Sequence, residues 1–370
     1  MHYHIILAEL CNSECRYCYG KSMEKLDDEK NLLNEKFKFD FSAPAEFSAP
    51  VEKLKKFLEK DKKAFLIFYG GEPLLEIEKI KEIMDNINVP FRIQTNGKLL
   101  DQLPSKYANK IDKMLISLDG GKERTDFNRG KGTYNKVIKN IELLRKNGYK
   151  GELIARMTIS SEFPDLYEQV LELIENGFDS VHWQLDAGFY QYDFNDDYEK
   201  FVEKYNQSVT KLIDYWTNEI KKGNVLKIYP FIAIIDSLLK NEKTLLRCGA
   251  GHSGYAIATD GKIIACPIMN CIKDFEAGDL NSKPSELKKF EVSGRCLECD
   301  YKDLCGGRCL YWNKSELWLE KGDELICKTI KHLIDELKIN IPEIKELIRN
   351  KNISEKDFEY EKYFGPEIIP

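Results

Sequence analysis

The sequence lacks the features that would place it in a membrane or direct it out of the cell. No window approaches the roughly eighteen uninterrupted apolar residues that a transmembrane helix needs. The apolar run at the N-terminus is too short for a signal peptide, and no basic leader precedes it. We therefore expect a cytoplasmic protein without a membrane partner.

The chain also lacks an excess of positive charge. Its formal net charge is −6, whereas a dedicated nucleic-acid binder usually carries a basic surplus, so we expect no nucleic-acid partner. Internal repeats and low-complexity linkers are missing as well. What is present is enough to build a sizeable core, because 42% of the 370 residues are hydrophobic and 19 Phe and 19 Tyr are among them.

The eleven cysteines are the most unusual feature of the composition. A reducing cytosol disfavours structural disulfides, so the binding of a metal or an iron–sulfur cluster explains them better.

Short apolar runs alternate with longer amphipathic ones over the first two-thirds of the chain. The predicted strands are His4–Glu9, Ala64–Tyr69, Phe91–Thr95, Lys113–Leu118, Leu153–Ile159 and Ser180–Leu185. The predicted helices include Val51–Lys60, Ile77–Asn86, Tyr134–Asn147 and Leu166–Asn176, and Gly148 and Gly177 stand where two of them should end.

Six strand–helix units in this order predict an α/β fold, with a parallel sheet that is partly or fully closed into a TIM-like (β/α)6 barrel over residues 1–235. A cysteine-rich domain over residues 236–330 and a charged helical tail over residues 331–370, interrupted at Pro342, should follow. In such barrels the chemistry gathers at the C-terminal ends of the strands.

The first cysteine group follows the first predicted strand. Cys11, Cys15 and Cys18 can hold one iron–sulfur cube and leave its fourth iron without a protein ligand. An open iron can chelate the amino and carboxylate groups of a methionine. A zinc site is the alternative, but this spacing is unusual for zinc and a fourth ligand is missing nearby.

This spacing, with Tyr17 just before the last cysteine, resembles the defining motif of the radical SAM superfamily. Gly70-Gly71-Glu72-Pro73 follows the second predicted strand and is similar to the family's Gly-Gly-Glu-Pro element. The resemblance implies that the backbone of this turn and Glu72 receive the methionine ammonium of S-adenosylmethionine (SAM). Glycines allow a close backbone approach, and a carboxylate complements a cation, although a Gly-Gly pair alone is usually only a tight turn.

Further contacts to SAM are implied at other strand ends. The stretch from Ser117 to Arg129 is similar to one in anaerobic sulfatase-maturating enzymes, and the resemblance gives Ser117 and Arg129 the ribose and the carboxylate. Tyr17 and Leu185 should approach the adenine. Asn96, at the end of the third predicted strand, is also an expected cofactor contact. Ordinary loop capping is the alternative for each polar residue.

The second cysteine set comprises Cys248, Cys266, Cys296, Cys299, Cys305, Cys309 and Cys327, and its spacing resembles the SPASM domain. The resemblance implies two auxiliary 4Fe–4S clusters beside the first, so three clusters in all. An inner cluster would be held by Cys248, Cys266 and Cys309, and an outer one by Cys296, Cys299, Cys305 and Cys327. The sulfatase-maturating enzymes carry a further cysteine at the position of Gly254. The inner cluster therefore has an open iron or recruits Cys271, which we favour, although a buried inert thiol is another alternative. A zinc ribbon formed by Cys296-x2-Cys299 with Cys305-x3-Cys309 is the structural alternative for this set.

SPASM enzymes act on peptides or protein side chains, so the resemblance predicts a peptide-modifying maturase that abstracts hydrogen with a 5′-deoxyadenosyl radical. Ferredoxin or flavodoxin should donate the electron. Only ten residues precede Cys11, which predicts that any leader peptide is held by a separate protein or by the barrel. Asp236 is a candidate base, or else a solvated helix cap.

Three other functions stay open. One is formylglycine formation by a sulfatase-type maturase, although Tyr69 stands where those enzymes carry glutamine, and Asp236 is out of register with their catalytic aspartate. The second is small-molecule dehydrogenation or decarboxylation. The third is a protein that only transfers electrons or scaffolds clusters, which would explain the cysteines but not the glycine–glutamate element.

Overall fold

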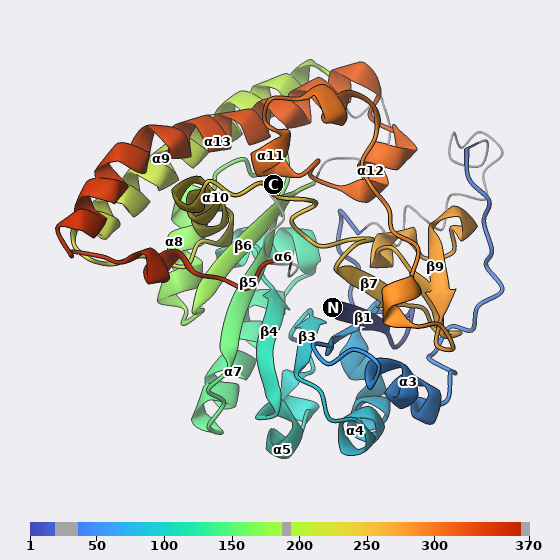
Figure 1. Ribbon diagram of the computed structural model, residues 1–370. Coiled ribbons are helices and arrows are strands. Elements are labelled where there is room, and N and C mark those ends of the chain that lie inside the picture. Colours follow the sequence, from blue (N-terminus) through green and yellow to red (C-terminus); the bar gives the residue numbers. More distant parts are fainter. Residues whose placement is uncertain (19–35, 187–193, 364–370) are drawn as a thin grey trace. The chain divides into compact units, whose positions relative to one another are not determined.

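Strands and helices alternate along the first half of the chain, as the hydrophobic pattern predicts (Figure 1). The structure is a computed structural model, and it describes residues 1–18, 36–186 and 194–363. The described chain divides into two units. The first comprises Met1–Leu118, Lys122–Ile154 and Gly249–Glu291, and the second comprises Asp119–Gly121, Ala155–Cys248 and Val292–Pro370.

The first unit is built on a sheet whose strands run in the order β4-β3-β2-β1-β7-β8-β9. The strands are β1 (His2–Ile6), β2 (Phe65–Tyr69), β3 (Phe91–Thr95), β4 (Ile111–Ser117), β7 (Gly254–Ile257), β8 (Lys262–Ile264) and β9 (Glu276–Asp279). Strands β1 to β4 and β7 pair in parallel, and β8 and β9 continue the sheet in antiparallel fashion. The predicted α/β class with a mainly parallel sheet is thereby confirmed.

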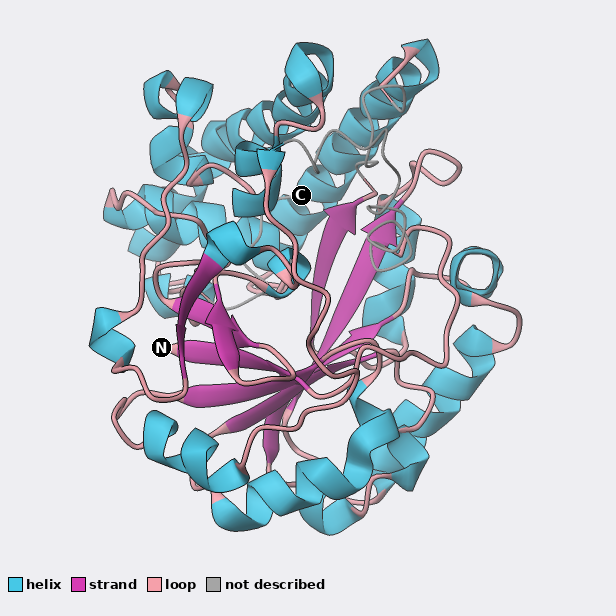
Figure 2. Ribbon diagram, turned by 90° about the vertical axis from the view of Figure 1, so that its right-hand side faces the viewer, coloured by secondary structure: helices cyan, strands magenta, loops and turns pink. Residues whose placement is uncertain are grey.

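Helices cover one face of these strands, and Figure 2 shows them running along the sheet. They are α3 (Val51–Leu58), α4 (Ile77–Asn86), α5 (Ser105–Ala108), α6 (Lys122–Arg129) and α7 (Thr133–Lys146). Helix α3 buries Val51, Leu54, Phe57 and Leu58, an amphipathic spacing, and the Phe57 ring packs against Tyr3 of β1 at 5.2 Å between ring centroids. Apolar strands such as Phe65–Tyr69 suit a sheet that is buried on both faces.

The second unit contains β5 (Glu152–Ile159, whose first residues belong to the first unit) and its neighbour β6 (Ser180–Leu185). Its helices are α8 (Tyr167–Glu175), α9 (Asp196–Lys221), α10 (Tyr229–Lys240), α11 (Lys302–Cys305), α12 (Leu310–Ser315) and α13 (Leu319–Arg349). The long helices α9 and α13 pack together, and Thr210 Oγ1 lies 2.9 Å from His332 Nε2. Among the described residues, every helix is too short or too polar to cross a bilayer.

Several predicted boundaries are confirmed, and two details are corrected. Gly148 and Gly177 follow α7 and α8 with φ of 88° and 86°, the left-handed conformation that ends a helix. The first strand is His2–Ile6, because Ala8 leaves it to form an antiparallel bridge with Glu46.

Helix α13 continues through Pro342, contrary to the predicted interruption. Pro342 lies on the exposed side of the helix, where the carbonyl that loses its partner can be hydrated.

A third detail concerns residues 249–291, which contribute to the first unit, because β7 pairs in parallel with β1 and extends its sheet. The predicted domain boundaries themselves stay a prediction.

Candidate functional site

The three-cysteine loop follows β1 and carries the thiols of Cys11, Cys15 and Cys18. The Cys18 N–H donates to the Cys15 carbonyl at 3.2 Å, which closes a turn within the loop. The Arg16 N–H donates to the Asn128 carbonyl of α6 at 2.9 Å, so the loop is anchored to the helix that ends with Arg129.

The Gly-Gly-Glu-Pro turn runs against the chain segment that leads into this loop. The Gly71 N–H donates to the Ala8 carbonyl at 2.8 Å, and the Glu72 N–H donates to the Leu10 carbonyl at 2.9 Å. A Cβ added at Gly71 would lie 2.2 Å from the Leu10 carbonyl oxygen, and one at Gly70 would lie 2.3 Å from that of Ala8. Both glycines are therefore required by the close approach of two backbones.

Glu72 is fully buried, and its carboxylate binds protein groups. Its Oε1 accepts hydrogen bonds from the Leu74 N–H at 3.0 Å and from Thr95 Oγ1 at 2.7 Å, and its Oε2 accepts one from the Asn96 N–H at 2.7 Å. Burial raises the pKa of this carboxyl, and the three donors oppose that shift. The carboxylate thus fixes the end of β3 beneath the cysteine loop.

Asn96 connects that strand end to the first cysteine. Its Nδ2 donates to Asn12 Oδ1 at 2.6 Å and to Ser13 Oγ at 3.2 Å, and it lies 3.8 Å from Cys11 Sγ. Three separate predicted elements, namely the cysteine loop, the glycine–glutamate turn and the end of β3, are therefore joined in one hydrogen-bonded network.

The other predicted SAM contacts lie at strand or helix ends. Arg129 is largely buried at the end of α6, and its guanidinium carbon lies 5.3 Å from the centroid of the Tyr17 ring. Ser117 ends β4 in the first unit, and Leu185 ends β6 in the second. Pro73 is buried and opens the short 3₁₀ turn Pro73–Glu76.

In the second unit, the four thiols predicted for the outer cluster influence one another. Burial raises the pKa of Cys305 to about 11, and the charges of Cys327 and Cys296 add to that rise. Burial also raises the pKa of Cys296 and of Cys327, and Cys299 contributes to both shifts. The four thiols therefore lie within electrostatic reach of one another.

The cysteines predicted for the inner cluster are divided between the units. Cys248 and Cys309 belong to the second, and Cys266 and Cys271 belong to the first. Cys271 has a φ of 67°. Burial raises its pKa to about 11, and the charges of Glu9 and Asp40 add to this rise.

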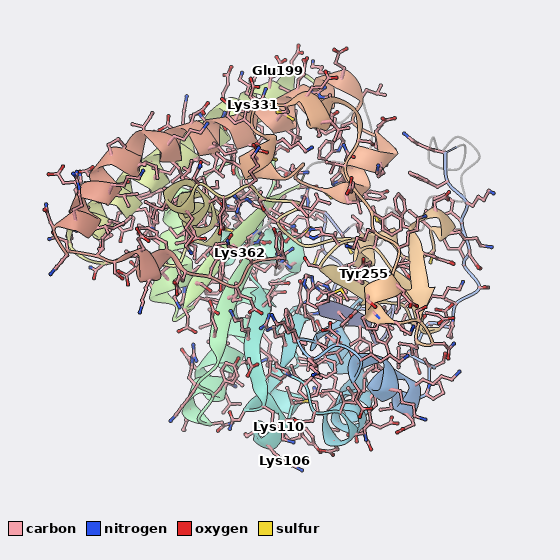
Figure 3. The ribbon with its side chains drawn as sticks, in the orientation of Figure 1. Lys106, Lys110, Glu199, Tyr255, Lys331 and Lys362 are labelled. Carbon is pink, nitrogen blue, oxygen red and sulfur yellow. The ribbon has the colours of Figure 1, made fainter. Side chains whose placement is uncertain are left out.

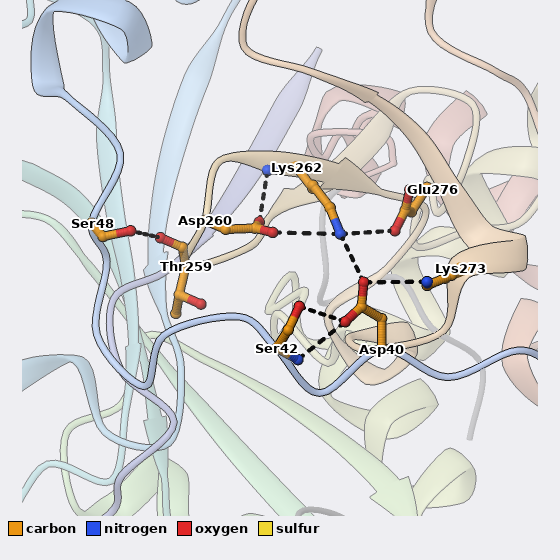
Figure 4. Close-up of polar contacts among 8 residues, drawn as sticks. All are labelled: Asp40, Ser42, Ser48, Thr259, Asp260, Lys262, Lys273 and Glu276. Atoms are coloured by element: carbon orange, nitrogen blue, oxygen red, sulfur yellow. Dashed lines mark hydrogen bonds and ion pairs between the residues drawn. The ribbon is translucent and has the colours of Figure 1, made fainter.

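The segment around Cys271 is joined to the segment that precedes α3. The Asp40 N–H donates to the Cys271 carbonyl at 2.8 Å. Figure 4 shows Lys262 of β8 among the carboxylates of Asp40, Asp260 and Glu276. Sequence reasoning missed the contact between Asp40 and Lys262, because these two residues are more than two hundred positions apart and no motif marks them.

Asp236, the candidate base, lies on α10 and is 2% exposed. Its carboxylate pairs with Lys240 Nζ at 2.5 Å and with Lys362 Nζ at 3.9 Å (Lys362 is labelled in Figure 3). This is the arrangement of a structural ion pair, and a role as a base stays a prediction.

The donor chemistry suits iron–sulfur clusters, since thiolates are the ligands that such clusters take. In residues 1–18, 36–186 and 194–363, no three His, Cys, Asp or Glu side chains are spaced as a finished metal-ligand set.

The fold and the loop define an α/β protein that carries three thiols at the C-terminal end of a parallel sheet. Residues 5–174 match the sequence profile of the Radical SAM superfamily, so this part of the chain is a radical SAM domain.

Related proteins agree with this assignment. The chain is 26% identical over 340 residues to a cysteine-type anaerobic sulfatase-maturating enzyme of Clostridium perfringens, covering 81% of this chain and 85% of that protein. It is 24% identical over 389 residues to the radical SAM cyclopropyl synthase TigE of Paramaledivibacter caminithermalis, covering 97% of this chain and 76% of that protein.

A solved structure of anSMEcpe with bound AdoMet superposes with a TM-score of 0.70 at 19% identity, covering 94% of this chain and 95% of that one, which shows the shared partial-barrel fold.

Proposed function

We propose that this protein binds SAM at a cluster held by Cys11, Cys15 and Cys18 and oxidatively modifies a peptide or protein side chain. The observation that carries the proposal is the Asn96 network, which ties the cysteine loop to the glycine–glutamate turn through Glu72. A scaffold or electron carrier has no need of that connection.

The chain's own residues have separate parts in this proposal. The backbone of the Gly70–Gly71 turn receives the methionine ammonium, and buried Glu72 keeps Asn96 and the end of β3 in place. Ser117 and Arg129 bind the ribose and the carboxylate, while Tyr17 and Leu185 approach the adenine. When bound and reduced, the cluster supplies the electron that cleaves SAM to a 5′-deoxyadenosyl radical.

Two auxiliary clusters complete the proposal. The outer one would be held by Cys296, Cys299, Cys305 and Cys327, whose thiols shift one another's pKa. The inner one would be held by Cys248, Cys266, Cys309 and Cys271.

A peptide substrate is supported by the solved structures of similar fold, since anSMEcpe was solved with a Cp18Cys peptide and SuiB of Streptococcus suis with its precursor peptide SuiA. A cytoplasmic ferredoxin or flavodoxin would donate electrons, and a separate protein or the barrel itself would hold any leader peptide.

Anaerobic reconstitution tests the proposal. The protein is supplied with iron, sulfide, dithionite and SAM, and 5′-deoxyadenosine is measured by mass spectrometry. We expect turnover-dependent formation of 5′-deoxyadenosine. A reconstituted protein that holds iron but forms none would be a scaffold or an electron carrier.

Formylglycine formation is the second candidate, favoured by the match to the sulfatase-maturating enzyme over 81% of this chain. Incubation with a sulfatase-derived cysteine peptide distinguishes the two. Conversion of its cysteine to an aldehyde supports sulfatase maturation, whereas 5′-deoxyadenosine without an aldehyde points to a different peptide.

A further inference from the structure

Arg308 lies on the short link between Cys305 and Cys309, which are predicted ligands of the two auxiliary clusters. Its φ of 56° is left-handed, an uncommon conformation for a residue with a side chain. Its backbone N–H, like that of Gly307, donates to the Cys305 sulfur. Its guanidinium carbon lies 4.9 Å from the centroid of the Trp318 ring.

The guanidinium carries a polar atom that the described protein leaves unsatisfied. Arg308 Nε is buried and has no hydrogen-bond partner. A buried N–H without an acceptor costs about 1–3 kcal/mol, so an acceptor outside the protein's own groups is expected there. Cluster sulfur is such an acceptor, and Arg308 lies three residues after Cys305 and directly before Cys309.

We propose that Arg308 is the counter-charge of the outer auxiliary cluster and keeps its reduction potential high. The inference rests on the proposed function, because it requires a cluster on Cys296, Cys299, Cys305 and Cys327. Reduction adds a negative charge to a cluster, and a fixed cation in a partly buried site stabilises the reduced form.

Arg295 offers a matched control in the same unit. Its charge lowers the pKa of the Cys296 and Cys327 thiols. Its side chain is 44% exposed, however, and pairs with Asp323 at 3.7 Å. Solvent screens such a charge, so its removal should change the potential less than removal of Arg308.

The test is an EPR-monitored redox titration of the full-length, anaerobically reconstituted protein. Auxiliary signals are identified as those that persist in Cys15→Ala. We expect Arg308→Gln to lower the equilibrium constant for reduction of one auxiliary cluster at least tenfold, about 59 mV for a one-electron couple. Arg308→Lys should restore most of the difference, and Arg295→Gln should shift the midpoint less.

Asp323→Asn provides a second measurement that does not depend on the stability of Arg308→Gln. Both Arg295 and Arg308 act on this carboxylate, so its removal leaves their positive charges less compensated and the midpoint should rise. An unchanged midpoint in both Arg308→Gln and Asp323→Asn, at full iron content, would overturn the inference and leave the proposed function standing. So would equal shifts in Arg308→Lys and Arg308→Gln. Absence of any auxiliary signal in Cys15→Ala would overturn both proposals.

Discussion

The two thiol-rich regions differ in the number of sulfurs and in the charges around them. In the first unit, three cysteines share a loop whose neighbours are the neutral Asn96 amide and the buried Glu72 carboxylate. In the second, four mutually interacting thiols lie within reach of Arg295 and Arg308. Three thiols leave one iron for a small ligand, whereas four enclose a cluster and leave it to electron transfer. We therefore assign SAM cleavage to the first region and electron handling to the second.

The largest effect is expected from Cys15→Ala. Two thiols cannot hold a cube with its vacant iron in the right place, so 5′-deoxyadenosine should fall below detection. The measurement is SAM cleavage after anaerobic reconstitution. Cleavage at the wild-type rate would remove the first region from the mechanism.

Cys299→Ala removes one thiol in the same way from the second region and sharpens the comparison. Some uncoupled SAM cleavage should continue while formation of modified peptide stops, because electron handling alone is lost. Both products are measured in one reaction by mass spectrometry. Equal loss of the two would refute the division of roles between the regions.

Gly71→Ala should damage the first region through sterics alone. The new Cβ would meet the Leu10 and Glu9 carbonyl oxygens, and overpacking of this kind costs about 1–3 kcal/mol. SAM affinity, measured by calorimetry, should fall together with the melting temperature.

Gly148→Ala is the control. Its new Cβ would meet nothing within 4 Å, but its φ of 88° makes an alanine strained there, so the variant is destabilised away from the turn. A similar loss of SAM affinity in Gly148→Ala would mean that general destabilisation, and not the turn, is responsible.

Arg247→Met should weaken the second region selectively. Arg247 is 1% exposed and donates to the Leu304 carbonyl at 2.7 Å and the Ala233 carbonyl at 3.2 Å, which links α10 to the end of α11 beside Cys305. Each stranded carbonyl costs about 1–3 kcal/mol, so auxiliary iron should be lost on mild warming before the first cluster.

Arg145→Met in the first unit is its matched control, since Arg145 donates to the Gly151 carbonyl at 2.9 Å. This variant should not release auxiliary iron preferentially. The same pattern of iron loss in both variants would contradict a selective role for Arg247.

The smallest effect is expected from Cys271→Ala. If Cys271 completes the inner cluster, SAM cleavage continues and only the auxiliary EPR signal changes. An unchanged auxiliary signal at full iron content would exclude Cys271 from the ligands.

Much of the first unit follows from local sequence pattern. Strand β3 and helix α4 match their predicted bounds, because an apolar run and an amphipathic repeat each leave one reasonable structure. The pairing of β7 with β1 could not be predicted, since a four-residue strand about 250 residues away carries too little signal.

The candidate site shows the same limit. The thiols and glycines could be recognised from their spacing, but the partners of Glu72 and the buried Nε of Arg308 depend on tertiary packing. The three donors that bind the Glu72 carboxylate, in particular, have no counterpart in the local sequence.

EPR spectroscopy of the reduced, oxygen-protected protein with and without SAM tests the central claim most directly. The account predicts a cluster signal that changes shape when SAM is added and that is missing in Cys15→Ala. A spectrum that is indifferent to SAM, or zinc in place of iron at Cys11, Cys15 and Cys18, would contradict it.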